Sequence, residues 1–193
     1  MPQSRSVLVA VAHPDEAAQL PPEAEIIVTG VGMVAASARL MEAIQERDIK
    51  RLRDRWVILN MGTAGAVRAN VTGTIVPGKI INRDVDEAAA SAVGLPPSVI
   101  TLTDAGMTLG TGDSFIMDEA LARLHGMRCD LVDMEGYAMA WVCQLMGIPF
   151  RAVKHISDTA DEQAVYWDDN VHTSAHALGN WYRRNCSDHR LLV

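Results

Sequence analysis

The stretch that decides the fold is DLVDMEGYAMAWVCQLMGIPFRAVKHISDTAD, residues 130–161. A short apolar run leads into Asp133 and Glu135, and carboxylates favour the positive end of a helix dipole, so a helix is expected to begin there. Apolar residues then recur at helical spacing as far as Gly147, and Pro149 cannot continue a helix. The segment therefore predicts a strand, a helix and a second strand, followed by a loop.

The second strand of this stretch ends at a candidate site. Residues 150–156 are rich in β-forming side chains and predict a buried strand, which Ser157 and Asp158 follow. In open parallel sheets, ligands bind beyond the carboxyl ends of the strands, so Asp158 stands where chemistry is expected. By the same criteria, strands are expected at residues 7–12, 26–28, 56–60, 74–81 and 98–103, and helices at 33–47 and from about 170 to 184. The pattern predicts the α/β class, with a mixed, largely parallel central sheet flanked by helices.

Composition limits the classes of protein that fit. A chain of 193 residues suits one domain over residues 1–193, and a net charge of -7 argues against a nucleic-acid-binding surface. Cys129, Cys143 and Cys186 form no C-x-x-C pair, and an odd number points to a reducing compartment. No apolar run approaches membrane-spanning length, and residues 7–12 are too short for a signal peptide. We expect a cytoplasmic, soluble protein without nucleic-acid or membrane partners.

Acidic residues follow the first expected strand. Pro14 suits the first turn of a helix, where its missing N–H costs nothing, and Asp15 and Glu16 would stand at that helix start. Carboxylates in a first turn can simply stabilise the helix dipole. Glu16 would also lie at the same edge of the sheet as Asp158, which makes it a candidate site residue.

Several of these segments carry a family resemblance. VDMEG at residues 132–136 and ISDTAD at residues 156–161 resemble the purine nucleoside phosphorylase/nucleosidase superfamily. Within it, the likeness is greatest to 5′-methylthioadenosine/S-adenosylhomocysteine nucleosidases. Four further segments occur in a consistent order: Glu16 after the first strand, TGVG at residues 29–32, MGTAGA at residues 61–66 and GTGDSFI at residues 110–116.

The resemblance implies an enzyme that hydrolyses the N-glycosidic bond of an adenine nucleoside, of the 5′-methylthioadenosine/S-adenosylhomocysteine type. It implies no cofactor, no metal, a small purine nucleoside as ligand and a homodimer. A purine is a poor leaving group unless it is protonated, and the sugar approaches an oxocarbenium ion, as in glycoside hydrolysis generally. By the resemblance, Asp158 is the general acid that protonates the purine, and Glu16 takes a proton from the attacking water.

Other residues are assigned to the parts of the nucleoside by the same resemblance. Glu135 would accept hydrogen bonds from the ribose hydroxyls, and Met134 would lie under the sugar. Phe115 would stack on the purine, because aromatic faces stack well on bases, and the backbone at Ile116 would read the base edge. Ser157 would orient the general acid. The complete set of expected substrate-binding residues is Thr63, Ala64, Gly65, Phe115, Ile116, Asp133, Met134, Glu135, Lys154 and Ser157.

Some positions depart from the family pattern or separate its reactions. Phosphorylases of the superfamily typically have a phosphate-binding arginine where this chain has Asn60, so water is the expected nucleophile here. Lys154 stands where the family usually has arginine, and lysine keeps the charge but loses the planar five-donor fork. The region of residues 71–103 is shorter than the matching region of the nucleosidases, which supplies dimer contacts and part of the 5′ pocket. The 5′ substituent therefore stays open, as does the choice of Tyr166 or Trp167 as the residue that caps the ligand.

Three other interpretations remain open. A phosphorylase would use phosphate in place of water, and a nucleoside-binding protein would keep the fold without turnover. Residues 12–16, AHPDE, also resemble the His-Pro-Asp-Asp-Glu segment of zinc-dependent sugar deacetylases, but the second Asp is absent. His172 and His176 are spaced like zinc ligands on a helix, yet no Glu follows His172 as H-E-x-x-H requires. We expect these two histidines on a solvated helix face.

Overall fold

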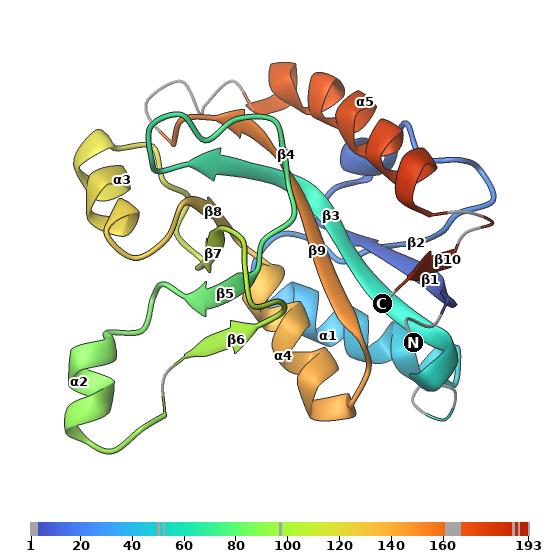
Figure 1. Ribbon diagram of the computed structural model, residues 1–193, viewed down its shortest axis with the longest axis horizontal. Coiled ribbons are helices and arrows are strands. Elements are labelled where there is room, and N and C mark those ends of the chain that lie inside the picture. Colours follow the sequence, from blue (N-terminus) through green and yellow to red (C-terminus); the bar gives the residue numbers. More distant parts are fainter. Residues whose placement is uncertain are drawn as a thin grey trace.

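A mixed sheet with helices on both faces forms the centre of the computed structural model, which describes residues 4–49, 51, 53–96, 98–160, 167–186, 188 and 190–192 (Figure 1). The strands are β1 (Ser4–Val11), β2 (Glu25–Val28), β3 (Trp56–Ala66), β4 (Thr74–Ile75), β5 (Lys79–Asn82), β6 (Val99–Thr101), β7 (Thr108–Thr111), β8 (Leu131–Asp133), β9 (Phe150–Asp158) and β10 (Arg190–Leu192). The α-helices are α1 (Met33–Glu46), α2 (Glu87–Ala92), α3 (Glu119–Gly126), α4 (Gly136–Met146) and α5 (Trp167–Asn185). Two short 3₁₀ turns are η1 (Pro14–Ala17) and η2 (Arg53–Arg55).

The strand order is β10-β1-β3-β8-β7-β5-β6, with β2 paired to β1, and β9 paired to both β3 and β4. The pairs β1–β2, β1–β3, β3–β9, β5–β7 and β7–β8 are parallel, and the remaining pairs are antiparallel. The sheet is therefore mixed and largely parallel, as the sequence predicts.

Side chains of the central strands alternate between two apolar layers, as the period of a β-strand requires. On β1 and β3, Leu8 and Ile58 belong to a core that includes residues of α1 and α4. Val9 and Leu59 point the other way, into a core that includes residues of α5. The helices α1 and α4 lie on one face and α5 on the other (Figure 1). Strands covered on both faces in this way read as continuous apolar runs.

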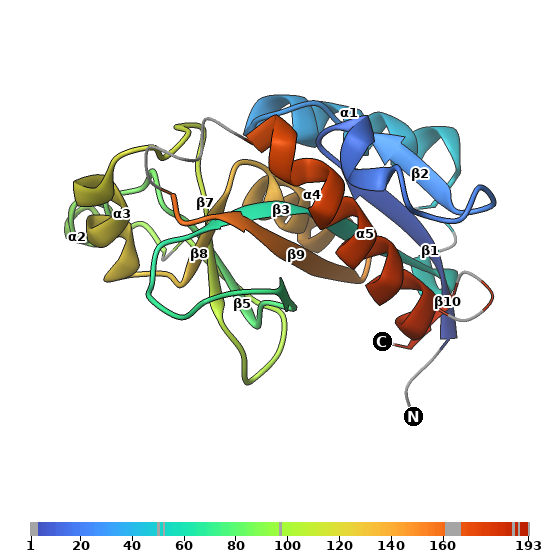
Figure 2. The same cartoon turned by 90° about the horizontal axis from the view of Figure 1, so that it is seen from above.

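Seen from above, α5 crosses the central strands, while α2 and α3 lie at the end of the sheet opposite to β1, β2 and β10 (Figure 2). A smaller apolar cluster of Ile81, Ile116, Ala122, Cys129, Val132 and Ala160 packs beneath α3. In the part of the chain that the structure describes, no helix combines the length and the hydrophobicity needed to cross a membrane.

The longest strand corrects one expectation. The strand expected at residues 56–60 is longer, because β3 continues to Ala66 and pairs with β9 as far as Gly65. Glycine is usually a turn signal. Here, Gly62 and Gly65 instead leave room for groups that approach the strand: an added Cβ would lie 2.7 Å from Oε1 of Glu16 at the first, and 2.9 Å from Oδ1 of Asp158 at the second.

One expectation between residues 71 and 103 was also wrong. The single strand expected at residues 74–81 is two strands, β4 and β5, separated by Pro77 and Gly78. Proline cannot donate to a strand ladder, which accounts for the break. The alanines at residues 88–90 belong to α2, and Asp86 caps that helix by accepting from the amides of Ala88 and Ala89. The other expected elements are present with ends that differ by a few residues.

Candidate functional site

A cavity of about 370 Å³ opens where several strands end. Its walls come from the segments that follow β1, β2, β5, β7 and β8, and from the last residues of β3 and β9. The lining residues are Ala12, His13, Glu16, Val31, Thr63, Ala64, Gly65, Arg83, Ser114, Phe115, Ile116, Met117, Val132, Asp133, Met134, Glu135, Ser157, Asp158 and Ala160. This is the edge at which an open parallel sheet binds ligands.

Glu16 is held by four hydrogen bonds at one side of the cavity. Its Oε2 accepts from the amides of Ala12 (2.9 Å) and His13 (3.1 Å), which closes the turn η1. Its Oε1 accepts from the amide (2.7 Å) and the hydroxyl (3.0 Å) of Thr63 on β3. The carboxylate is therefore fixed in one orientation, and it has both a capping role in η1 and a place in the cavity wall.

Asp158 enters the cavity through an irregularity in the sheet. The register of β3 against β9 pairs Ala64 with Ile156 and Gly65 with Asp158, so Ser157 forms a bulge. The Ser157 hydroxyl donates to Oδ2 of Asp158 (2.7 Å), and the amide of Ala160 donates to Oδ1 (2.8 Å). Bulges next to active sites commonly re-aim a side chain. Here the bulge brings the Ser157 hydroxyl and the Asp158 carboxylate into one cavity wall.

A buried ion pair joins Asp133 in the cavity wall to Lys154 behind it. The ammonium of Lys154 is 2.9 Å from Oδ2 of Asp133, and both side chains are almost completely buried. Asp133 also accepts from the Thr111 hydroxyl (2.5 Å) and from the amide of Gly136 at the start of α4 (2.9 Å). Burial opposes the charge on Lys154, but Asp133, Glu135 and Glu16 outweigh it and raise the pKa of the lysine. Both oxygens of Asp133 are therefore already engaged within the protein.

Glu135 is a buried carboxyl without a cation within ion-pair distance among the described residues. Its Oε1 accepts from the amide of Gly32 at the start of α1 (2.9 Å). Burial, and then the charge of Asp133, raises its pKa to about 7, against the opposing effect of Lys154. Glu135 can therefore hold a proton near neutral pH, which suits a group that exchanges hydrogen bonds with hydroxyls.

The loop after β7 forms the outer wall. Phe115 is 48% exposed, whereas Ile116 beside it is buried. This arrangement leaves an aromatic face free at the mouth of the cavity. Arg83, at the end of β5, also lines the cavity and was missed by the sequence reasoning. Its position directly after β5 could have indicated it. The expectation of one strand over residues 74–81 did not give that strand its correct end.

The structure brings the expected site residues together. Both expected catalytic residues, Asp158 and Glu16, line the cavity, as do all expected substrate-binding residues except Lys154, which lies buried behind it. Their chemical roles stay predictions. Tyr166 and Asp161 lie outside the described residues, and so does the side chain of Trp167.

The two histidines that are spaced like zinc ligands lie on α5. His172 and His176 are exposed on α5, as expected for a solvated face. Within residues that the structure describes, no three His, Cys, Asp or Glu side chains gather closely enough to hold a metal ion.

The layered sheet, with its cavity at the strand ends, defines an α/β protein of the nucleoside phosphorylase-like fold. The chain belongs to the phosphorylase superfamily, whose family model matches residues 23–180. Among solved structures, it is similar to futalosine hydrolase of Helicobacter pylori (TM-score 0.78, 18% identity, 93% of this chain and 96% of that one). It is also similar to a 5′-methylthioadenosine/S-adenosylhomocysteine nucleosidase from Colwellia psychrerythraea in complex with adenine (TM-score 0.75, 22% identity, 91% and 92%).

Curated relatives carry related names. The chain is 29% identical to a 5′-methylthioadenosine/S-adenosylhomocysteine nucleosidase of an Exiguobacterium species, over 62% of this chain and 63% of that protein. It is 26% identical to an aminodeoxyfutalosine nucleosidase of Helicobacter pylori, over 65% and 66%. The chain therefore spans just under two thirds of the length of these two relatives.

Proposed function

We propose that this protein hydrolyses the N-glycosidic bond of an adenine nucleoside of the 5′-methylthioadenosine/S-adenosylhomocysteine type. The observation that carries the proposal is the pair of carboxyl groups, Glu16 and Asp158, that line one cavity and are each oriented by a neighbouring hydroxyl. Hydrolysis needs a group that takes a proton from water and another that protonates the purine. Glu16 is the base in this proposal and Asp158 is the acid. The names of the curated relatives support it.

The remaining walls suit the two halves of a nucleoside. Met134 and Glu135 line the same cavity, and Glu135, which also binds the amide of Gly32 at the start of α1, can exchange hydrogen bonds with the ribose hydroxyls. Phe115 offers an exposed aromatic face for the purine, and stacking on such a face is commonly worth about 1–3 kcal/mol per base. The ring of the sugar would then lie near Glu16, and the base near Asp158.

Water is the proposed nucleophile, because the cavity offers no free cation for phosphate among its described residues. Arg83 is the only lysine or arginine in the described lining, and its guanidinium is engaged with the loop after β7. Asn60 is buried in β3 and donates to the carbonyl of Ala10 (3.1 Å) instead of facing the cavity. A phosphate dianion would find little to neutralise it.

We further propose that the protein acts in the cytoplasm as a homodimer. The outer face of α1 and α4 exposes Val34 (80%), Trp141 (52%) and Leu145 (72%), and a shallow hollow between the two helices adjoins them. Large apolar side chains that cluster on a surface mark interaction sites. A second copy of the chain is the proposed partner for this face. Size-exclusion chromatography with light scattering tests this by measuring the molar mass of the protein in solution.

One assay tests the reaction. The protein is incubated with 5′-methylthioadenosine, S-adenosylhomocysteine or aminodeoxyfutalosine, with and without phosphate, and the released base and sugar are identified. We expect adenine and free sugar in phosphate-free buffer. A sugar 1-phosphate as the main product would indicate a phosphorylase, and binding without any base release would indicate a nucleoside-binding protein. Comparison of the three nucleosides identifies the 5′ substituent.

A further inference from the structure

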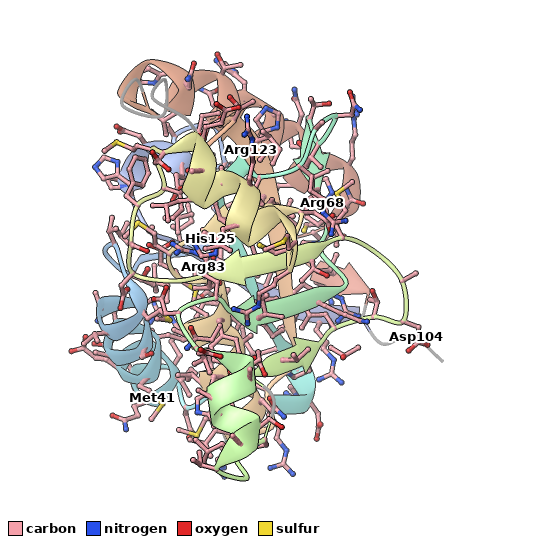
Figure 3. The ribbon with its side chains drawn as sticks, turned by 90° about the vertical axis from the view of Figure 1, so that its left-hand side faces the viewer. Met41, Arg68, Arg83, Asp104, Arg123 and His125 are labelled. Atoms are coloured by element: carbon pink, nitrogen blue, oxygen red, sulfur yellow. The ribbon has the colours of Figure 1, made fainter. Side chains whose placement is uncertain are left out.

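Arg83 is a buried cation in the wall of the cavity. It follows β5 directly, and only 1% of its side chain is exposed. Figure 3 shows it near His125, at the edge of the molecule that α3 covers. Burial and then the charge of Arg83 lower the pKa of His125, so the two side chains are close enough to interact.

The guanidinium makes most of its hydrogen bonds to the loop after β7. One terminal nitrogen, Nη1, donates to the Ser114 hydroxyl (2.9 Å) and lies 3.4 Å from Oδ1 of Asp84. The other, Nη2, donates to the carbonyl of Gly112 (2.9 Å) and to that of Ser114. Three hydrogen bonds from one rigid, planar group hold residues 112–114 against the end of β5.

Gly112 shows how closely the two segments are packed. A Cβ added at this position would lie 2.8 Å from Cζ of Arg83, and it would also overlap Oδ1 of Asp84. The other oxygen of Asp84 accepts from the amide of Asp113 (2.8 Å). The glycine is therefore needed for the close approach of the guanidinium to the loop backbone, a use of glycine that sequence alone does not reveal.

This arrangement is costly for a purely structural contact. Burial lowers the pKa of Arg83, against the opposing effects of Asp84 and Asp133, and the Nε atom is buried without a hydrogen-bond partner among the described residues. Replacing buried ionic groups by well-packed apolar ones is often neutral or stabilising. A buried cation with incomplete pairing, placed in a cavity wall, is instead typical of a functional site.

We infer that Arg83 is a positioning residue for purine binding. It fixes residues 112–114, and thereby sets the position of Phe115 and Ile116, which follow them directly and line the cavity. Arg83 already donates to the carbonyl of Ser114, and we assign recognition of the base edge to the backbone at residues 115 and 116. The inference rests on the proposed function, since it assigns this wall to the base.

The test compares the dissociation constant of adenine, measured by calorimetry, with KM and kcat for 5′-methylthioadenosine. Arg83→Met removes every donor but keeps the length of the side chain. We expect it to raise both the adenine dissociation constant and KM at least tenfold, while kcat at saturation changes less than threefold. The adenine dissociation constant and KM of Arg83→Lys should lie between those of Arg83→Met and of the wild type. A purely structural role would lower the unfolding midpoint without this division between KM and kcat.

A matched control is Arg68→Met. Arg68 also bonds a backbone carbonyl, that of Gly126 (2.7 Å), and pairs with Asp130 (3.0 Å), but it does not line the cavity. The Arg68→Met substitution should leave the adenine dissociation constant and KM within twofold of wild type. Folded Arg83→Met with unchanged adenine affinity, or with a loss in kcat alone, overturns the inference.

Two further outcomes separate the inference from the proposed function. If Arg83→Met does not fold, Ser114→Ala removes one acceptor of the guanidinium and should weaken adenine binding twofold to fivefold. Unchanged affinity in both Ser114→Ala and Arg83→Lys then overturns the inference. A wild-type protein that binds adenine but releases no base would refute hydrolysis and leave the role of Arg83 testable by affinity. A wild-type protein that does not bind adenine refutes both.

Discussion

Replacement of Glu135 by glutamine should stabilise the fold above neutral pH while removing turnover. Glu135 is buried, and burial followed by the charge of Asp133 raises its pKa from 4.5 to about 7. Between pH 4.5 and about pH 7, Glu135 releases its proton in the unfolded chain but keeps it in the folded protein. The contribution of this group to stability is therefore fully present below pH 4.5 and is lost as the pH rises through 7.

The size of the effect follows from the shift. One pKa unit corresponds to about 1.4 kcal/mol, so ionised Glu135 should cost the fold about 3 kcal/mol at pH 8. Most of this loss, roughly 2 to 3 kcal/mol, develops between pH 5 and pH 8. Glutamine keeps the shape of the side chain and an oxygen that can accept from the Gly32 amide, but it does not ionise.

Urea unfolding at pH 5 and pH 8 measures this. The free energy of unfolding of Glu135→Gln, relative to wild type, should grow by roughly 2 to 3 kcal/mol over that interval. Glu119→Gln, at a side chain 73% exposed on α3, is the control and should show no comparable growth. Base release by Glu135→Gln should fall severely if Glu135 has its proposed role, because the carboxyl proposed to exchange hydrogen bonds with ribose is then gone. A relative stability that stays constant or shrinks from pH 5 to pH 8 would refute the reasoning.

Three other outcomes are expected. Asp158→Asn should lower base release about a hundredfold or more, with little change in adenine affinity or unfolding midpoint, and near-full turnover would contradict its role as the acid. Gly62→Ala would place a Cβ 2.7 Å from Oε1 of Glu16, so kcat should fall while the circular dichroism spectrum is kept; an unchanged kcat would mean that the position of Glu16 does not matter. Chelation with EDTA should leave base release unchanged, since no three metal-binding side chains gather within the described residues, and a loss restored by zinc would favour the deacetylase interpretation.

The central strands and the acidic residues at their ends could be predicted because periodicity and strand-end position carry that information. Glu16 and Asp158 were both placed at the same edge before any contact was known. The boundaries within glycine-rich segments could not be predicted in this way. Gly62 and Gly65 carry the signal of a loop, but they lie within β3, where the absence of a side chain makes room for the two carboxylates.

Contacts between distant segments were also beyond the reach of the sequence. Lys154 forms its ion pair with Asp133, and Thr111 completes the same network. Nothing in the local pattern of β9 indicates which carboxylate a buried lysine selects. Arg83 shows the same limit, since its four contacts lie about thirty residues further along the chain or at its immediate neighbour.

The start of α1 has a consequence for the order of folding. Gly32, at its N-cap, has no side chain to cap the helix, and two distant carboxylates bind its first amides instead: Glu135 at Gly32, and Asp113 at Met33 (2.7 Å). These partners are 103 and 80 residues away along the chain, and loops of that length must close before either bond can form. The first turn of α1 is therefore completed only after β7, β8 and the start of α4 are in place, although α1 is the first α-helix to appear in the sequence. The amides of Gly32 and Met33 should accordingly be among the last in this helix to gain protection from hydrogen exchange during refolding.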